Sequence, residues 1–136
     1  MSKKITISCD TGSLPKVRKF LNQVLVGANL GEVETHKMVL AVDEICANLI
    51  IHANNCDASK NLNVSVDIIP SKKVVFSIRD QGKSFDFESY TEPEMDKIVS
   101  SRRKGGLGLI LVRRIMDHIE FTTEKNYNIC RLVKKL

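Results

Sequence analysis

Three polar residues, Glu44, Asn48 and His52, follow one another at four-residue steps in a segment that otherwise carries mostly Ile, Leu and Ala. Residues four apart lie on one face of a helix, so the three side chains could face a common cleft. A glutamate there can accept a proton from a hydroxyl group or from water. An asparagine amide oxygen suits Mg²⁺, which prefers oxygen ligands. The alternative is a solvent-facing stripe of an amphipathic helix, in which His52 is a helix-terminus or packing residue.

A second candidate site lies where an alternating, strand-like segment gives way to Asp80-Gln81-Gly82. A carboxylate at this position would stand at the edge of a sheet, where it can accept a hydrogen bond from the amino group of a purine. Gly82 has no side chain, so the purine ring could approach the backbone closely. Taken alone, an Asp-x-Gly sequence is also an ordinary turn signal.

A glycine-rich stretch opens the last apolar helical segment and consists of Gly105, Gly106, Leu107 and Gly108. Glycines at the start of a helix leave backbone N–H groups free to bind phosphate, and the helix dipole favours negative charge there. The residues just before it, Arg102, Arg103 and Lys104, would supply positive charge for a terminal phosphate. The stretch is not a Walker A loop, since no Gly-Lys-Ser/Thr follows, and not a dinucleotide fingerprint, since no strand directly precedes it.

The elements that position these residues follow from the hydrophobic periodicity. Alternation predicts strands over residues 4–9, 61–68, 74–78, 118–123 and 127–134, and helical spacing predicts helices over about 13–29, 32–52 and 105–116. Ser13 could cap the first helix, with Pro15 in its first turn. Residues 80–104 break the pattern, and a loop of that length is often a functional lid. The order favours an α+β fold in a single domain over residues 1–136. We expect a two-layer α/β sandwich whose mixed, mostly antiparallel sheet is covered on one face by helices.

Composition narrows the class of protein. The 136 residues are 43% apolar and 27% charged, as in ordinary soluble proteins, and no apolar run approaches the ~20 residues of a membrane helix. The N-terminus lacks the apolar region of a signal peptide, and the four cysteines form no CxxC pair, so we expect a cytoplasmic protein with free thiols. The net charge of +5 is scattered and aromatic residues make up 5%, which disfavours nucleic-acid binding and suits an anionic ligand or acidic partner.

The order of the three candidate sites is more specific than any one of them. A helix with Glu-x-x-x-Asn, a strand ending in Asp-x-Gly, a long loop and a Gly-x-Gly-Leu helix start resemble the Bergerat-fold (GHKL) ATPases over nearly the whole chain. This is the superfamily of gyrase, Hsp90, histidine kinases and MutL. The resemblance implies that Glu44 is the base, that Asn48 binds Mg²⁺ and that Asp80, beside Gly82, holds the adenine amino group of ATP. It also implies that the Gly-x-Gly turn lines the phosphates beneath a mobile lid.

Within the superfamily, the chain is similar to the small bacterial anti-sigma factor/serine-protein kinases. It shares their short length, the Asn-x-x-x-His-Ala ending at residues 48–53 and the Phe85-Asp86 pair after the Asp motif. The resemblance implies an ATP-dependent serine/threonine protein kinase that uses Mg²⁺, phosphorylates a small antagonist protein and works as an anti-sigma-factor switch. It further implies a sigma factor as a partner, a homodimer, and a basic lid residue, either Arg103 or Lys104, that contacts the terminal phosphate.

One position departs from the family pattern and supports an alternative function. Ser84 replaces the last glycine of Asp-x-Gly-x-Gly, which could narrow the adenine pocket or lower the affinity for nucleotide. The alternative is a catalytically weak or inactive module that holds ATP or ADP and sequesters a protein partner. The presence of both Glu44 and Asn48 favours the enzyme. A third hypothesis, binding of duplex DNA through the positive charge, predicts binding that weakens with salt.

Overall fold

The computed structural model describes residues 2–81 and 106–136, except for the side chains of residues 106–109. A strand β1 (Ser2–Ser8), a 3₁₀ turn η1 (Thr11–Ser13) and the helices α1 (Leu14–Gly27) and α2 (Glu32–Asn48) come first. A π-helical turn η2 (Leu49–Ala53) extends α2, and a hairpin of β2 (Asn61–Ile69) and β3 (Lys73–Asp80) follows. The last elements are the helix α4 (Gly106–Ile115) and a hairpin of β4 (His118–Glu124) and β5 (Tyr127–Lys135).

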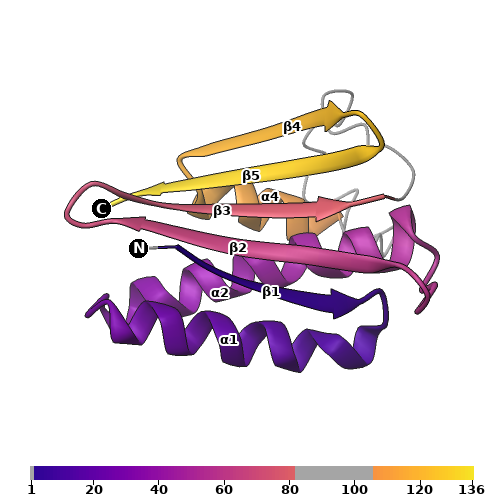
Figure 1. Ribbon diagram of the computed structural model, residues 1–136. Coiled ribbons are helices and arrows are strands. Elements are labelled where there is room, and N and C mark those ends of the chain that lie inside the picture. The colour runs from indigo at the N-terminus through magenta and orange to yellow at the C-terminus, as the bar shows by residue number, and fades with distance from the viewer. Residues whose placement is uncertain (1, 82–105) are drawn as a thin grey trace.

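The described strands form one sheet in the order β1-β2-β3-β5-β4, and every pairing in it is antiparallel. The helices α1, α2 and α4 lie together on one face of this sheet, with α2 packed against both of the others (Figure 1). The predicted α+β fold, a two-layer sandwich with helices on one face, is confirmed. The sheet among the described residues is wholly rather than mostly antiparallel.

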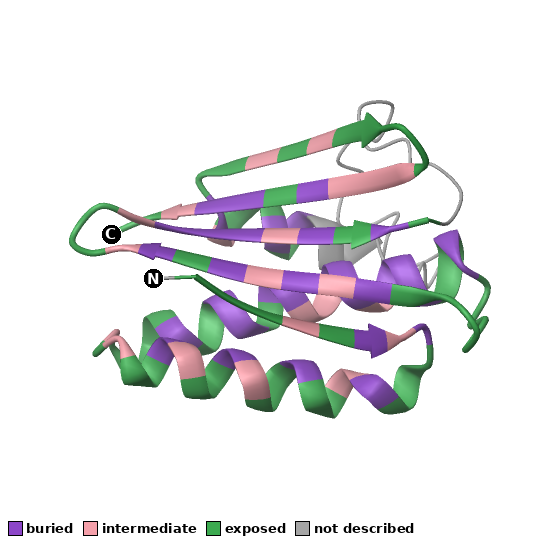
Figure 2. Ribbon diagram, viewed as in Figure 1, coloured by how far each residue is buried: buried purple, intermediate pink, exposed green. Residues whose placement is uncertain are grey.

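The core lies between the sheet and the helices, and alternation along the strands explains its position. In β2 every second side chain is apolar and buried, while the residues between them are half-buried or exposed (Figure 2). The helices contribute apolar residues at helical spacing to the same layer. Each fully buried side chain of this kind stabilises the fold by about 1.5–3 kcal/mol. The largest of them are Phe76, Leu21, Leu25, Met38, Ile45, Ile50, Leu62, Ile78 and Leu132.

The start of α1 differs from the sequence prediction. Ser13 stands at the cap position, but its side chain makes no capping hydrogen bond. Its hydroxyl group instead lies 3.2 Å from Ser8 Oγ in the strand before it. Asp10 caps the preceding 3₁₀ turn by accepting a hydrogen bond from the Gly12 N–H. Pro15 lies in the first turn of α1 as predicted.

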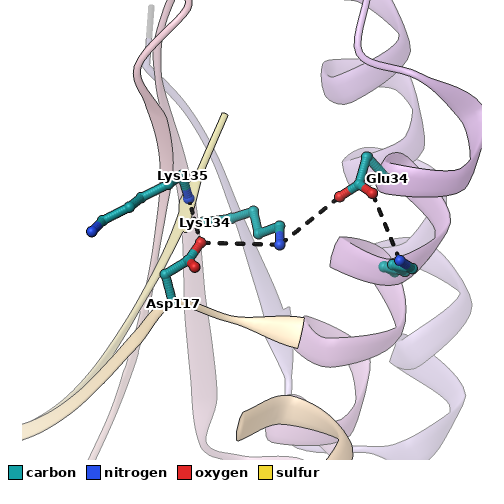
Figure 3. Close-up of polar contacts among 5 residues, drawn as sticks. Glu34, Asp117, Lys134 and Lys135 are labelled. Atoms are coloured by element: carbon teal, nitrogen blue, oxygen red, sulfur yellow. Dashed lines mark hydrogen bonds and ion pairs between the residues drawn. The ribbon is translucent and has the colours of Figure 1, made fainter. Parts of the chain in front are cut away.

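Lys134, near the end of β5, connects three parts of the chain. Its Nζ lies 3.9 Å from Glu34 Oε2 in the first turn of α2 and 4.0 Å from Asp117 Oδ2 between α4 and β4 (Figure 3). The backbone N–H of Lys135 donates to the same Asp117 oxygen at 2.7 Å. These contacts hold together the end of the molecule at which α2 begins and α4 ends.

The four cysteines are free thiols, as the sequence predicts, and three of them are buried. In the described part of the chain, no helix has both the length and the apolar character that a membrane crossing requires.

Candidate nucleotide-binding site

Glu44 and Asn48 lie one turn apart near the end of α2, as their spacing predicts. Glu44 is half-buried, and Asn48 is buried, with 6% of its surface exposed. The predicted α-helix over residues 32–52 ends at Asn48. His52 belongs to η2, whose turn closes on the fifth residue rather than the fourth, and it is exposed, unlike Asn48.

The charge state of Glu44 depends on its surroundings in α2. Burial raises the pKa of the Glu44 carboxyl group, and the negative charge of Asp43 raises it further. Asp43 pairs with Arg18 of α1, whose Nε lies 3.3 Å from Asp43 Oδ1. Burial raises the pKa of Asp43, whereas the Arg18 charge lowers it. A carboxylate whose pKa is moved toward the working pH is a better proton acceptor, so this environment suits Glu44 to the role of a general base.

Asp80 is the last residue of β3 and continues the inward-facing row of Val74, Phe76 and Ile78. Its carboxylate therefore lies on the helix-covered face of the sheet, and only 2% of the residue is exposed. Burial, and after it the charge of Asp80, raises the pKa of the nearby Cys130 thiol. An ionised carboxylate out of water is costly unless donors hydrogen-bond to it, so the donors around Asp80 decide what it can do.

One of these donors is Asn54, a residue that the sequence motifs did not single out. Its Nδ2 donates to Asp80 Oδ2 at 3.0 Å and to the carbonyl oxygen of Leu49 at 2.8 Å. Asn54 directly follows η2, and only 1% of it is exposed. The contact connects the end of η2, which extends α2, to the end of β3, 26 positions later in the chain. The one feature of the sequence that could have indicated Asn54 is that a polar residue follows an apolar run, and this is also typical of any helix end.

The predicted phosphate-binding stretch lies at the start of α4. This helix begins at Gly106 and packs against α2. Gly106, Leu107 and Gly108 therefore fall in its first turn, where backbone N–H groups have no partner within the helix. That is the position the phosphate-binding prediction requires. The remaining predicted site residues, Gly82, Arg103, Lys104 and Gly105, lie outside the described residues, as does Ser84, so their roles stay predictions.

Three segments thus come to one end of the molecule: the end of α2 with η2, the end of β3 and the start of α4 (Figure 1). Among the described residues, no three His, Cys, Asp or Glu side chains gather as a metal site. Asn48 has a buried amide nitrogen with no hydrogen-bond partner among the groups that the structure describes. Mg²⁺ in nucleotide sites is held by one or two protein ligands together with phosphate oxygens and water. The unpaired NH₂ group is a donor, which can hydrogen-bond to a phosphate oxygen, and the amide oxygen of the same side chain offers the single protein ligand that a nucleotide-borne Mg²⁺ can use.

A surface hollow of about 800 Å³ lies at the opposite end of α2 and belongs to a different region. The end of α1 and the start of α2 line it, with Val26, Leu30 and Val33 among its apolar residues. It contains none of the predicted site residues.

A comparison of the sequence with models of protein families matches the histidine kinase-like ATPase domain over residues 7–134. The chain belongs to this family. The matched range runs from β1 to β5 and so contains every described segment of the candidate site.

The curated relatives of this histidine kinase-like ATPase domain include serine-protein kinases named RsbW. The one from Staphylococcus epidermidis is 33% identical over 109 residues, which cover 76% of this chain and 66% of the relative. The one from Halalkalibacterium halodurans is 29% identical over 99 residues, which cover 70% of this chain and 58% of the relative. The chain therefore matches only 58% to 66% of the length of these relatives.

Solved structures share the fold of this histidine kinase-like ATPase domain. The RsbU and RsbW domains of Rv1364c from Mycobacterium tuberculosis match with a TM-score of 0.72 at 15% identity, covering 100% of this chain and 32% of that one. The SiaB–SiaC complex from Pseudomonas aeruginosa matches with a TM-score of 0.66 at 13% identity, and the match covers 98% of this chain and 89% of that one. The predicted membership of the Bergerat-fold superfamily and the similarity to anti-sigma factor/serine-protein kinases are therefore confirmed.

Proposed function

We propose that this domain is an ATP-dependent serine/threonine protein kinase that phosphorylates a small antagonist protein and acts as an anti-sigma-factor-type switch. The observation that carries the proposal is the buried carboxylate of Asp80, bonded to Asn54 next to the helix that bears Glu44 and Asn48. The similarity to RsbW serine-protein kinases supports the class of reaction and of substrate. It also suggests a sigma factor as a second partner, a homodimer and a cytoplasmic location.

Asp80 would select the base of the nucleotide. The amino group of adenine donates hydrogen bonds, and an ionised carboxylate only accepts them. Guanine carries an oxygen acceptor at the same ring position, so its oxygen would meet the carboxylate oxygen without a proton between them. The site should therefore bind ATP in preference to GTP.

The groups at the end of α2 and the start of α4 would support phosphoryl transfer. Asn48 would hold Mg²⁺ through its amide oxygen, and a bound Mg²⁺ neutralises charge on the β- and γ-phosphates. Glu44, one turn earlier, would accept the proton of the attacking serine hydroxyl group. The first turn of α4 would present backbone N–H groups to the phosphates, with Arg103 or Lys104 near the terminal one. Positioning and electrostatic stabilisation account for most of the catalysis of phosphoryl transfer, and these groups supply both.

Labelled ATP provides the direct test of this function. The protein is incubated with Mg²⁺, γ-labelled ATP and candidate small antagonist proteins, and we expect label on a serine of one of them. Bound nucleotide without any labelled protein would instead favour a module that holds nucleotide and sequesters its partner, an alternative to which Ser84 points. A protein that binds no adenine nucleotide would contradict both functions.

The surroundings of Glu44 predict the pH dependence of the kinase. A base must be deprotonated, so activity should fall as the pH drops through the raised pKa of Glu44. The pKa of Glu44 is raised first by burial and then by the charge of Asp43, so Asp43→Asn should lower that pKa. The acidic limb of the pH–rate profile should therefore move to lower pH in the variant.

The matched control for this prediction is Asp67→Asn, which makes the same charge change at an exposed position of β2. Its pH–rate profile should overlay that of the wild type. An Asp43→Asn profile that also overlays the wild type would mean that Glu44 does not limit the rate at acidic pH.

A further inference from the structure

The chain leaves α2 through a turn whose geometry is fixed at both ends. The carbonyl oxygen of Leu49 accepts a hydrogen bond from the backbone N–H of Asn54, five residues later, at 3.0 Å. The carbonyl oxygen of Ile50 accepts one from the Cys56 N–H at 2.8 Å, and Asn55 takes a left-handed conformation with φ of 51°. Left-handed residues of this kind end helices. The turn therefore holds the backbone of Asn54 in one place.

The side chain of Asn54 is equally constrained. Its Nδ2 lies between two acceptors, the Leu49 carbonyl oxygen at 2.8 Å and Asp80 Oδ2 at 3.0 Å. Only the NH₂ end of an amide can donate to both, so the hydrogen-bond network itself fixes the orientation of the amide. Both hydrogens of the group are used. One of them goes to a carboxylate oxygen, and a hydrogen bond to an ionised oxygen is stronger than one between neutral groups.

Packing alone gives no reason for an asparagine at this position. Asn54 is 1% exposed, and its Oδ1 is buried without a hydrogen-bond partner among the described groups. An unpaired buried polar atom destabilises a protein, and an apolar residue of similar size would avoid that cost. An apolar residue would remove two bonds of Nδ2, to the Leu49 carbonyl oxygen and to Asp80 Oδ2. The Leu49 oxygen would keep its bond from the Asn54 backbone N–H, so the contact with Asp80 is the one that nothing in the turn replaces.

We infer that Asn54 is a positioning residue for base selection: its amide holds Asp80 Oδ2 and so fixes the carboxylate that accepts the adenine amino group. The inference rests on the proposed nucleotide site. Rotation of a carboxylate about its last side-chain bond has broad energy minima, so a carboxylate without such a bond can turn away from the base. A carboxylate turned away from the base no longer accepts from the adenine amino group, and this weakens the preference for ATP.

Nucleotide binding, measured without any protein substrate, tests this role. Asn54→Leu removes the amide and keeps the number and branching of the side-chain heavy atoms. We expect its affinity for ATP to fall about three- to tenfold while its affinity for GTP stays the same or rises, so that the ATP-to-GTP ratio falls. Asn54→Asp keeps the size but places a second carboxylate beside Asp80, and the ratio should fall there as well. Asn63→Leu, the same change at a half-buried position of β2 facing away from the helices, should leave the ratio unchanged.

A combined variant separates positioning from general stability. In an Asp80→Asn background the change Asn54→Leu should have no further effect on the ATP-to-GTP affinity ratio, because Asn54 acts on the base only through the Asp80 carboxylate, which the background lacks. Melting curves identify variants that fail to fold. A clear wild-type preference for ATP that both Asn54 variants retain would overturn the role of Asn54 and leave the nucleotide site standing. A wild-type protein that binds ATP no better than GTP would overturn the proposed site itself.

Discussion

Replacing Glu44 with Gln should lower the rate of phosphate transfer to protein by about a hundred- to ten-thousandfold, the range that general base catalysis contributes. Glutamine has nearly the same shape, but its amide cannot accept the proton of an attacking hydroxyl group. ATP affinity should stay unchanged, since the proposed base contacts the attacking serine rather than the nucleotide. Single-turnover transfer of labelled phosphate and calorimetric titration with ATP measure the two effects separately.

The matched control is Glu34→Gln at the other end of α2, where the carboxylate is exposed and pairs with Lys37 and Lys134. It should transfer phosphate at the wild-type rate. Burial disfavours the charge of Glu44, so a melting temperature at neutral pH that does not fall in Glu44→Gln would exclude misfolding as the cause. Phosphate transfer near the wild-type rate in Glu44→Gln would mean that Glu44 is not the base.

Asp80→Asn should weaken ATP binding by roughly ten- to a hundredfold, because a buried hydrogen bond to a charged group is worth ~1.5–3 kcal/mol. The substitution replaces one acceptor oxygen with a donor NH₂ group beside the adenine amino group. The new asparagine side chain also lies against Asn54 Nδ2, which donates to Asp80 Oδ2 at 3.0 Å in the wild type. The affinity of the variant for GTP should fall little, so most of the preference for ATP over GTP should disappear. Calorimetry with both nucleotides measures the change.

Folding and charge need separate controls in this experiment. A melting curve checks folding, and Asp67→Asn, at an exposed position of β2, removes one negative charge without touching the site. An Asp80→Asn protein that melts normally and still binds ATP as tightly as the wild type would show that Asp80 is only a turn residue. The assignment of the base pocket would then be wrong.

The sequence predicted those parts of the fold that depend on regular periodicity. The described strands and the three α-helices lie close to their predicted positions, because alternation in segments such as β2 and helical spacing in α1 follow from which side chains must be buried. The same logic placed Glu44 and Asn48 on one face of α2 and Asp80 at the end of a strand.

The features that the sequence did not predict correctly have local physical causes. Periodicity does not distinguish an α-turn from a π-turn, so the sequence predicts one α-helix through His52 where the structure has a π-helical turn from Leu49. Ser13 was expected to cap α1, but its hydroxyl group lies next to Ser8, whose proximity depends on how β1 and η1 fold back. Asn54 was missed because its partner, Asp80, is 26 residues away, and no spacing rule connects an asparagine after a helix to the end of a strand in the next hairpin.

The antiparallel register places both ends of the described chain at the opposite end of the sheet from Asp80. Ser2 pairs with Asp67 and Lys135 with Lys73, whereas Asp80 pairs with Asn128 at the other end of the same strands. The N- and C-terminal ends lie near one another in Figure 1. A segment joined to either end would therefore begin at the end of the sheet opposite to Asp80. A match with the same fold covers 32% of a Mycobacterium tuberculosis chain that contains both an RsbU and an RsbW domain.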